Sequence, residues 1–343
     1  MRAIQAKTFS GYDGLRQMEL PKPQPAKDRV LVRVTAAGVT PLEYTVLSGG
    51  HPRAKAPLVL GNEGAGLIED AGDSGLAVGS RVMFTGPYGV GENGTWQEWL
   101  LVRPEHLALV PDAIDDVAAA SLPVAYLTAQ VTLTLAGFKP GMTVLAPGIG
   151  GSVGNATYQL ARAHGAGKVI STAGSAAKAA KARELGFEDV VDLSSEGLAE
   201  GVRRITAGKG VDIVIESIGG SVTSEALSSL AIGGVLITLG YSAGRKTTID
   251  VTNLIWKRAR MAGFSLFAQS PTAIATAWRD VIPLIVSGSV KPIVERVYRF
   301  GEAGEALRHL IEDRPFGKVV LAGDAQRLLS LQKPNPRTTK AGP

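Results

Sequence analysis

The chain has 343 residues, a formal net charge of +5 and a sequence pI near 9.3, and its apolar content of 45% is typical of a globular protein with room for two domains. It has no cysteine, which excludes disulfides and every cysteine-ligated zinc or iron–sulfur site. Lys and Arg form no dense stripe and no stretch reaches the ~18 apolar residues of a membrane helix, so we expect no nucleic-acid partner, no membrane partner and a cytoplasmic location.

Short apolar runs separated by Gly and Pro dominate the first 110 residues. Four of these runs lie at 30–34, 66–69, 81–84 and 99–102. Runs of this length between turn residues predict a compact β-rich domain, for which we expect residues 1–121.

From residue 115 the pattern changes to Ala-rich helical stretches that alternate with branched strands. The expected strands are 143–146, 168–171, 190–192, 212–216 and 235–239. This alternation is typical of a doubly wound parallel sheet, and we expect it to form a separate α/β domain over 122–262.

The alternation stops near Arg260. A helix around 272–287 and a strand at 318–321 follow, and we expect residues 263–323 to return to the first domain and complete it. The sheet domain would then be an insertion between two halves of the first domain. The last residues, 324–343, are predicted to be a polar tail.

A glycine-rich turn lies between the strand that ends at 147 and the helix predicted over 153–164. Gly148, Gly151 and Gly154 stand three residues apart, with Ser152 and Val153 between the last two. Glycine allows the backbone to approach a pyrophosphate, and the start of the helix offers unpaired N–H groups and a positive dipole end. The turn therefore predicts a dinucleotide phosphate site, although such glycines also close tight turns that bind nothing.

The end of the second strand distinguishes two nicotinamide cofactors. An NAD site normally has a carboxylate there for the ribose, but this strand ends in Ala173 followed by Gly174, Ser175 and, after two alanines, Lys178. A hydroxyl donor and an ammonium suit a 2′-phosphate, so NADP(H) is favoured over NAD(H). The alternative is that Lys178 simply lies on the solvated face of a helix over 176–185.

Several motifs together resemble the medium-chain dehydrogenase/reductase superfamily, and in particular its zinc-free quinone oxidoreductase (zeta-crystallin-like) group. They occupy residues 36–44, 61–66, 79–82, 94–99, 119–123, 127–129 and 317–321. The resemblance implies an α/β fold with a GroES-like β-rich catalytic domain and an inserted Rossmann doubly wound parallel sheet. It also implies a homodimer, for which strand 235–239 is our candidate for the exposed sheet edge.

The resemblance also bears on metal binding. In the zinc enzymes of the superfamily, a Cys and the His of a Gly-His-Glu motif bind catalytic zinc. The matching places here are Gly38-Val39-Thr40 and Asn62, and only Glu63 of the motif persists. We expect no metal, because one carboxylate does not supply the three protein ligands that zinc takes.

The remaining site residues are implied by the resemblance. Those expected near the nicotinamide and its ribose are Thr128, Ser217, Tyr241, Ser242 and Phe267, and Lys318 is expected to reach the cofactor. The candidate catalytic hydrogen-bond donors are Thr40, Tyr44, Asn62 and Thr128, with Tyr44 the candidate proton donor. Tyr44 as a wall of the pocket and Asn62 as a loop-bracing amide are the structural alternatives.

Two positions depart from the group's pattern. Relatives often carry Asn where Thr40 stands and Tyr where Leu193 stands. The first bears on the substrate pocket, and the second on the preference for NADP.

The implied function is a zinc-independent, NADPH-dependent reductase that transfers hydride to a quinone or an α,β-unsaturated carbonyl. An enoyl-thioester (CoA or carrier-protein) reductase is the alternative, for which Arg53 and Lys55 would supply positive charge to a phosphate. A non-catalytic NADPH-binding protein is the third interpretation.

Overall fold

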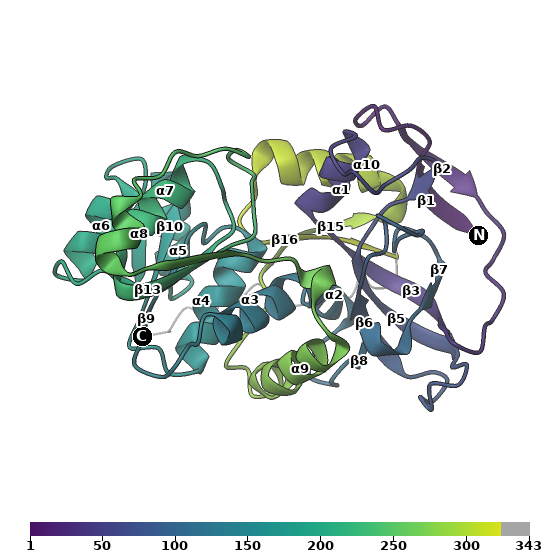
Figure 1. Cartoon of the computed structure of the whole chain (residues 1–343). Coiled ribbons are helices and arrows are strands. Elements are labelled where there is room, and N and C mark those ends of the chain that lie inside the picture. Colours follow the sequence, from purple (N-terminus) through teal and green to yellow (C-terminus); the bar gives the residue numbers. More distant parts are fainter. Residues whose placement is uncertain (324–343) are drawn as a thin grey trace, which may run out of the picture. The chain divides into compact units, whose positions relative to one another are not determined.

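The computed structural model describes residues 1–323, which divide between two compact units (Figure 1). One consists of Met1–Pro123, Val294–Asp313 and the segment that begins at Lys318, and we call it the β-rich unit. The other consists of Val124–Ile293 and Arg314–Gly317, and we call it the Rossmann unit.

The β-rich unit is built on two sheets. The smaller sheet has the strand order β2-β1-β4, and the larger has the order β15-β16-β3-β5-β6-β8, with β7 paired to β3. The elements in chain order are β1 (Arg2–Ala6), β2 (Leu15–Glu19), β3 (Val30–Val39), α1 (Pro41–Leu47), β4 (Leu58–Val59), β5 (Glu63–Asp70), β6 (Arg81–Thr85), β7 (Trp99–Val102), η1 (Pro104–His106), β8 (Leu107–Leu109), α2 (Asp116–Ala120), β15 (Val294–Arg299), η3 (Phe300–Glu302), α10 (Ala303–Arg308), η4 (His309–Asp313) and β16 (Lys318–Ala322).

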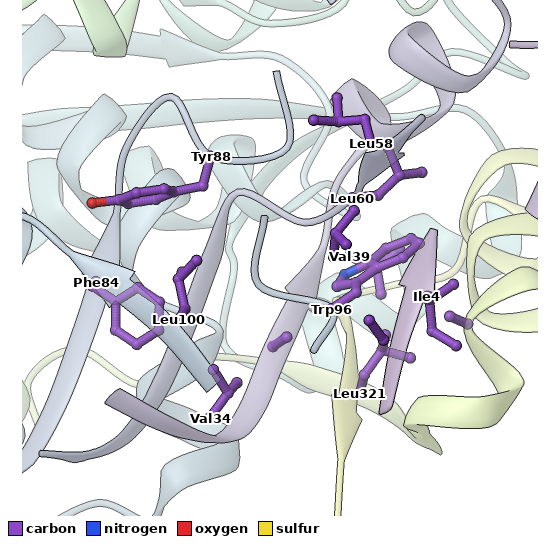
Figure 2. Close-up of a cluster of buried hydrophobic side chains, with 14 of the residues drawn as sticks. Ile4, Val34, Val39, Leu58, Leu60, Phe84, Tyr88, Trp96, Leu100 and Leu321 are labelled. Carbon is purple, nitrogen blue, oxygen red and sulfur yellow. The ribbon is translucent and has the colours of Figure 1, made fainter. Parts of the chain in front are cut away.

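The hydrophobic core of the β-rich unit combines side chains of its early strands, such as β3, with side chains of its last strand, β16. Strand β16 runs antiparallel to β3, with Leu321 opposite Ala37. Figure 2 shows Leu321 and Val39 beside the indole of Trp96, which is completely buried. The Trp96 indole N–H donates to the Gly38 carbonyl oxygen at 3.3 Å, so the largest side chain of the core is also satisfied as a hydrogen-bond donor.

The Rossmann unit is a parallel sheet of six strands with helices connecting them. Its strand order is β11-β10-β9-β12-β13-β14, so β9 lies between β10 and β12. The elements in chain order are α3 (Pro123–Leu135), β9 (Thr143–Ala146), α4 (Ser152–Ala163), β10 (Lys168–Ala173), α5 (Ala176–Glu184), β11 (Asp189–Asp192), α6 (Leu198–Ile205), β12 (Val211–Glu216), α7 (Ser221–Ser228), β13 (Leu230–Thr238), α8 (Thr252–Lys257), β14 (Arg260–Gly263), η2 (Leu266–Ala268) and α9 (Pro271–Val286). Since the strand order reverses between β9 and β12, the loops after these two strands form the place where such sheets bind ligands.

The sheet edge differs from our expectation. Strand β13, which contains the predicted edge strand 235–239, is paired on both sides, with β12 and with β14. The edge is β14, whose four residues are all exposed. Its sequence, Arg-Met-Ala-Gly, has neither alternation nor a branched run, so its pairing with β13 and not its own propensity makes it a strand.

The return to the β-rich unit also begins later than predicted. Helix α9 stays with the Rossmann unit, where Gln130 of α3 donates to Asp280 of α9 at 3.1 Å. Segment 314–317 belongs there too, because the Gly317 N–H donates to the Gly150 carbonyl at 2.8 Å and Lys181 lies over the Phe316 ring. The β-rich unit therefore resumes at Val294, is interrupted once more, and continues from Lys318. The predicted polar tail, 324–343, lies outside the described residues.

Within residues 1–323, no helix is both long and apolar enough to cross a bilayer.

Candidate functional site

The turn after β9 has the geometry of a phosphate cradle. Gly148 takes a positive φ of +82°, and the Gly151 N–H donates back to its carbonyl oxygen at 2.8 Å. A Cβ at Gly154 would overlap that same carbonyl oxygen, so only glycine fits where α4 meets the turn. Gly151 caps α4 without any side-chain hydrogen bond, which leaves the first N–H groups of the helix, including those of Ser152 and Val153, to an anion.

The loop after β12 is fixed by a buried carboxylate that our sequence interpretation did not single out. Glu216 accepts hydrogen bonds from the N–H groups of Ile218 and Gly219 at 2.5 and 2.8 Å. It also accepts from the hydroxyls of Thr223 and Thr238, at 2.9 and 3.1 Å. One side chain thus holds together the ends of β12 and β13 and the start of α7. An acid directly after the apolar run Ile213–Ile215 is the sequence signal for such a group.

The residues expected at the nicotinamide lie in the Rossmann unit. Ser217 follows Glu216, and the Ser242 hydroxyl donates to the Ile218 carbonyl at 3.3 Å, which joins the loops after β12 and β13. Tyr241 is 46% exposed in the second of these loops. The other two residues lie elsewhere in the unit: Thr128 is buried in α3, and Phe267 is half-buried in η2.

Two basic residues, Lys178 and Arg314, lie close together near the end of β10, where a 2′-phosphate is expected. Ser175 caps α5, Gly174 before it is exposed, and nothing lies within 4 Å of a Cβ built there. The Lys178 ammonium donates to the Arg314 carbonyl oxygen at 2.6 Å. Partial burial and the Arg314 guanidinium lower the pKa of Lys178. Arg314 was missed by our sequence interpretation, because it lies far along the chain in the segment that rejoins the Rossmann unit.

In the β-rich unit, Thr40, Glu43 and Asn62 form a buried hydrogen-bonded chain. Thr40 follows β3 and caps α1, and both its N–H and its hydroxyl donate to one oxygen of Glu43, at 2.6 and 2.7 Å. The Asn62 amide donates to the Thr40 hydroxyl oxygen at 3.1 Å. This chain unites two predicted catalytic residues, Thr40 and Asn62, with an acid that we had not considered.

The carboxylate of Glu43 is unusual because it is only 2% exposed. Burial raises its pKa to about 7, and the Glu63 carboxylate adds to that effect. The hydrogen bonds from Thr40 and the positive charge of Lys318 oppose it. The group therefore titrates near neutrality, far above an ordinary glutamate.

Lys318, which we expected to reach the cofactor, has a buried partner in its own unit. Its ammonium is buried in the β-rich unit and forms an ion pair with the Glu63 carboxylate, which is completely buried as well. A Cβ at Gly38 would overlap that carboxylate, so β3 must have a glycine at this position for the pair to fit. Lys318 thus neutralises Glu63 within the β-rich unit, and its contact with the cofactor stays a prediction.

Tyr44 is half-buried against the hydrophobic core of the β-rich unit. Its ring lies against that of Tyr12, with centroids 5.3 Å apart, and Arg308 covers the other ring of the pair. This contact involves the ring of Tyr44 and not its hydroxyl. The hydroxyl therefore stays our candidate proton donor, and a wall of the pocket stays the alternative role.

The residues at the positions of the zinc ligands do not suit zinc. Thr40 and Asn62 are bonded to each other, Glu63 is neutralised by Lys318, and Glu43 binds Thr40. Zinc prefers thiolates, imidazoles and unengaged carboxylates, which this set does not offer. Among residues 1–323, no three His, Cys, Asp or Glu side chains are grouped so that they could hold a metal ion.

A GroES-like unit combined with a Rossmann unit whose turn suits a dinucleotide is the organisation of a nicotinamide-dependent oxidoreductase. Family profiles agree: one described as zinc-binding dehydrogenase matches residues 152–287, and one described as alcohol dehydrogenase GroES-like domain matches residues 26–112. The chain belongs to the medium-chain dehydrogenase/reductase superfamily, which confirms the predicted family and fold class.

Individual relatives include enzymes with different names. The quinone oxidoreductase of Rattus norvegicus is 30% identical over 327 residues, which cover 94% of this chain and 97% of that protein. Erythronolide synthase EryA2 of Saccharopolyspora erythraea is 34% identical over 301 residues, which cover 86% of this chain but only 8% of the synthase.

Solved structures give the same family. A mycobacterial protein complexed with NADPH superposes with a TM-score of 0.84 at 29% identity, over 94% of this chain and all of that one. An NAD-dependent alcohol dehydrogenase superposes equally well, with a TM-score of 0.84 at 28% identity and the same coverage. Overall structural similarity therefore does not distinguish a preference for NADP(H) from one for NAD(H). The residues around the expected 2′-phosphate position must decide between the two cofactors.

Proposed function

We propose that this chain is a metal-free, NADPH-dependent reductase that acts on a quinone or an α,β-unsaturated carbonyl. The observation that carries the proposal is the hydrogen-bonded Thr40–Asn62 pair. In this chain, these two neutral residues occupy the positions at which zinc-dependent relatives have their zinc ligands. Such groups stabilise a developing oxyanion without a Lewis acid.

The cofactor proposal depends on local residues of the Rossmann unit. The free N–H groups at the start of α4 would hold the pyrophosphate, and Ser175, Lys178 and Arg314 would bind the 2′-phosphate. When bound, the cofactor supplies the hydride. The positively charged pair at Lys178 and Arg314 favours NADPH, since NADH has no phosphate at this position.

The acceptor's oxygen gains negative charge when the hydride arrives, and this chain must stabilise it. Thr40 and Asn62 are the donors that we assign to it, with Tyr44 from helix α1 and Thr128 from helix α3 as further candidates. One aligned donor is worth about 10²–10³ in rate in an oxyanion hole. Thr40 is held in place by four hydrogen bonds, including one from the Leu42 N–H to its hydroxyl oxygen, so its position is well defined before an acceptor binds.

An enoyl-thioester reductase is the second candidate. Arg53 and Lys55 are both exposed, in the loop between α1 and β4, and would attract the phosphates of CoA or of a carrier protein. The match to part of a polyketide-type synthase supports this alternative.

The deciding experiment is anaerobic NADPH oxidation with three acceptors in parallel: 9,10-phenanthrenequinone, a simple enone and crotonyl-CoA, each with a chelator present. We expect turnover with the quinone or the enone that the chelator does not reduce. Faster turnover with crotonyl-CoA, lost in Arg53→Ala/Lys55→Ala, would favour the thioester alternative. Tight NADPH binding without any turnover would leave only a binding role.

We also propose that the protein forms a homodimer through the β14 edge. An unpaired edge strand can bond to the same strand of a second copy across a two-fold axis. Close by in the chain, α8 carries Ile255 and Trp256, which are 65% and 77% exposed. Large exposed apolar side chains are typical of a covered surface.

Light scattering after size exclusion tests the dimer. The unmodified protein should have twice the chain mass, and Trp256→Asp should reduce it to the monomer mass. Val78→Asp is the control, since Val78 is an apolar residue of the β-rich unit that is also largely exposed, at 65%. A monomeric unmodified protein would contradict the proposal.

A further inference from the structure

We propose that the buried carboxylate of Glu216 is a counter-charge for the nicotinamide ring and makes the Rossmann unit favour the oxidised form of the cofactor. The inference rests on the proposed function, because it concerns the cofactor that this function requires. It involves a single unit, since Glu216 and the loops after β12 and β13 all belong to the Rossmann unit.

Four hydrogen-bond donors surround the carboxylate of Glu216, which is completely buried. One of its oxygens accepts from the N–H groups of Ile218 and Gly219, and the other accepts from the hydroxyls of Thr223 and Thr238. A carboxyl group that accepts this many hydrogen bonds is stabilised in its ionised form. The donors therefore stabilise the negative charge, but none of them carries a positive charge that would neutralise it.

The elements around Glu216 contain no cation. Strand β12 packs mainly on β9, β13 and α7, and none of these four elements has a Lys, Arg or His. Among the residues that the structure describes, Glu216 forms no ion pair. The first cation along the loops after β12 and β13 is Arg245, which is exposed and lies over the Tyr241 ring. The charge of Glu216 is therefore not compensated within the protein.

Hydrogen bonding alone does not explain why this residue is charged. A glutamine side chain could accept from both N–H groups with its oxygen and donate to both hydroxyl oxygens with its amide. It would keep all four hydrogen bonds without a buried charge, which destabilises a fold when nothing neutralises it. The structure of the loops therefore requires the hydrogen bonds of Glu216 but not its charge, and the charge points to a ligand.

The loops that Glu216 holds are the ones expected at the nicotinamide. The Ala243 N–H and the Ser242 hydroxyl both donate to the Ile218 carbonyl oxygen, at 2.8 and 3.3 Å. A Cβ at Gly240 would overlap the Ser217 carbonyl oxygen, so the two loops are in direct contact. The carboxylate therefore lies at the paired ends of β12 and β13, where we expect the ring.

A negative charge at this place acts differently on the two forms of the cofactor. The proposed reaction converts a neutral nicotinamide ring into a cationic one. Opposite charges attract more strongly inside a protein than in water, because the effective dielectric constant is lower. Glu216 would therefore stabilise the oxidised form relative to the reduced form, and with it the positive charge that develops as the hydride leaves.

The test is the ratio of the Kd for NADP⁺ to the Kd for NADPH, measured by isothermal titration calorimetry with no acceptor present. Glu216→Gln removes the charge and can keep all four hydrogen bonds. The ratio should rise about tenfold, the order expected for one unit charge at an effective dielectric constant of about 20. This equals a rise of about 30 mV in the two-electron potential of the bound cofactor. The Kd for adenosine 2′,5′-bisphosphate, which has no nicotinamide, should not change.

Three further variants separate the charge from the structure. Thr238→Val removes one hydrogen bond but keeps the charge, so it should leave the ratio unchanged. Thr238→Lys places an ammonium beside the carboxylate from the same half-buried position and should raise the ratio, so it also serves as the second variant should Glu216→Gln not fold. Glu200→Gln removes an exposed acid of α6 and should change none of the three constants.

The outcomes distinguish this inference from the proposed function. If Glu216→Gln has the same ratio as the unmodified protein, or if Thr238→Val shifts the ratio equally, Glu216 only braces the loops and the inference is wrong. If the unmodified protein binds neither NADP⁺ nor NADPH, the proposed function fails and the counter-charge with it. If the ratio shifts as expected but no acceptor is reduced, the counter-charge is supported and the reductase activity is not.

Discussion

Replacing Lys318 with methionine should lower the free energy of unfolding by about 3–5 kcal/mol, the cost of breaking a buried ion pair from one side. The ammonium of Lys318 and the carboxylate of Glu63 are both shielded from water, and Glu63 would lose the positive charge that neutralises it in the core. Urea denaturation followed by tryptophan fluorescence measures the change, since Trp96 lies in the same core.

Two further variants make this result specific. Lys22→Met removes the same kind of group from an exposed pair with Glu69, 2.6 Å apart, and should cost no more than about 1 kcal/mol. Glu63→Gln/Lys318→Met removes both charges and should recover most of the loss. If Lys318→Met were no worse than Lys22→Met, the pair would contribute little and the burial of Glu63 would need another explanation.

The parts of the fold that follow from local chemistry could be predicted from the sequence. The strand before Gly148 and the helix that contains Gly154 are evident from apolar periodicity, and the steric need for glycine is the same in any chain that makes this turn. The order of units was equally accessible, because the change from turn-rich runs to alternating strands and helices is a property of long segments.

The parts that depend on distant partners could not be predicted. Nothing near Lys318 indicates that its ammonium meets Glu63, and nothing near Arg314 indicates that it returns to Lys178. Strand β14 is a strand only because β13 offers it a free edge. The capping pattern of Thr40 and Glu43 can be recognised in the sequence. Whether such a glutamate is solvated or buried, however, depends on the residues packed around it. Here Glu43 is buried, and burial raises its pKa.

Lys178→Met/Arg314→Gln should reverse the preference between the two nicotinamide cofactors. Each partner lost from a charged phosphate removes about 1.5–3 kcal/mol, or about 10- to 10²-fold in affinity. The Kd for NADPH should therefore rise by about 10²-fold or more, while the Kd for NADH, which has no 2′-phosphate, should stay nearly constant. Nicotinamide fluorescence, titrated at one fixed salt concentration, gives both constants.

The single variants and a charge control complete this test. Arg314→Gln keeps the backbone carbonyl that Lys178 binds, so it reports the guanidinium alone. Lys209→Ala removes an exposed cation from the loop between α6 and β12 and should change neither constant, which separates a local phosphate contact from the effect of net charge. If the unmodified protein binds NADH as tightly as NADPH, or if the double variant keeps its preference, the basic pair does not read the phosphate. In that case Lys178 serves only to hold segment 314–317 against the rest of the Rossmann unit.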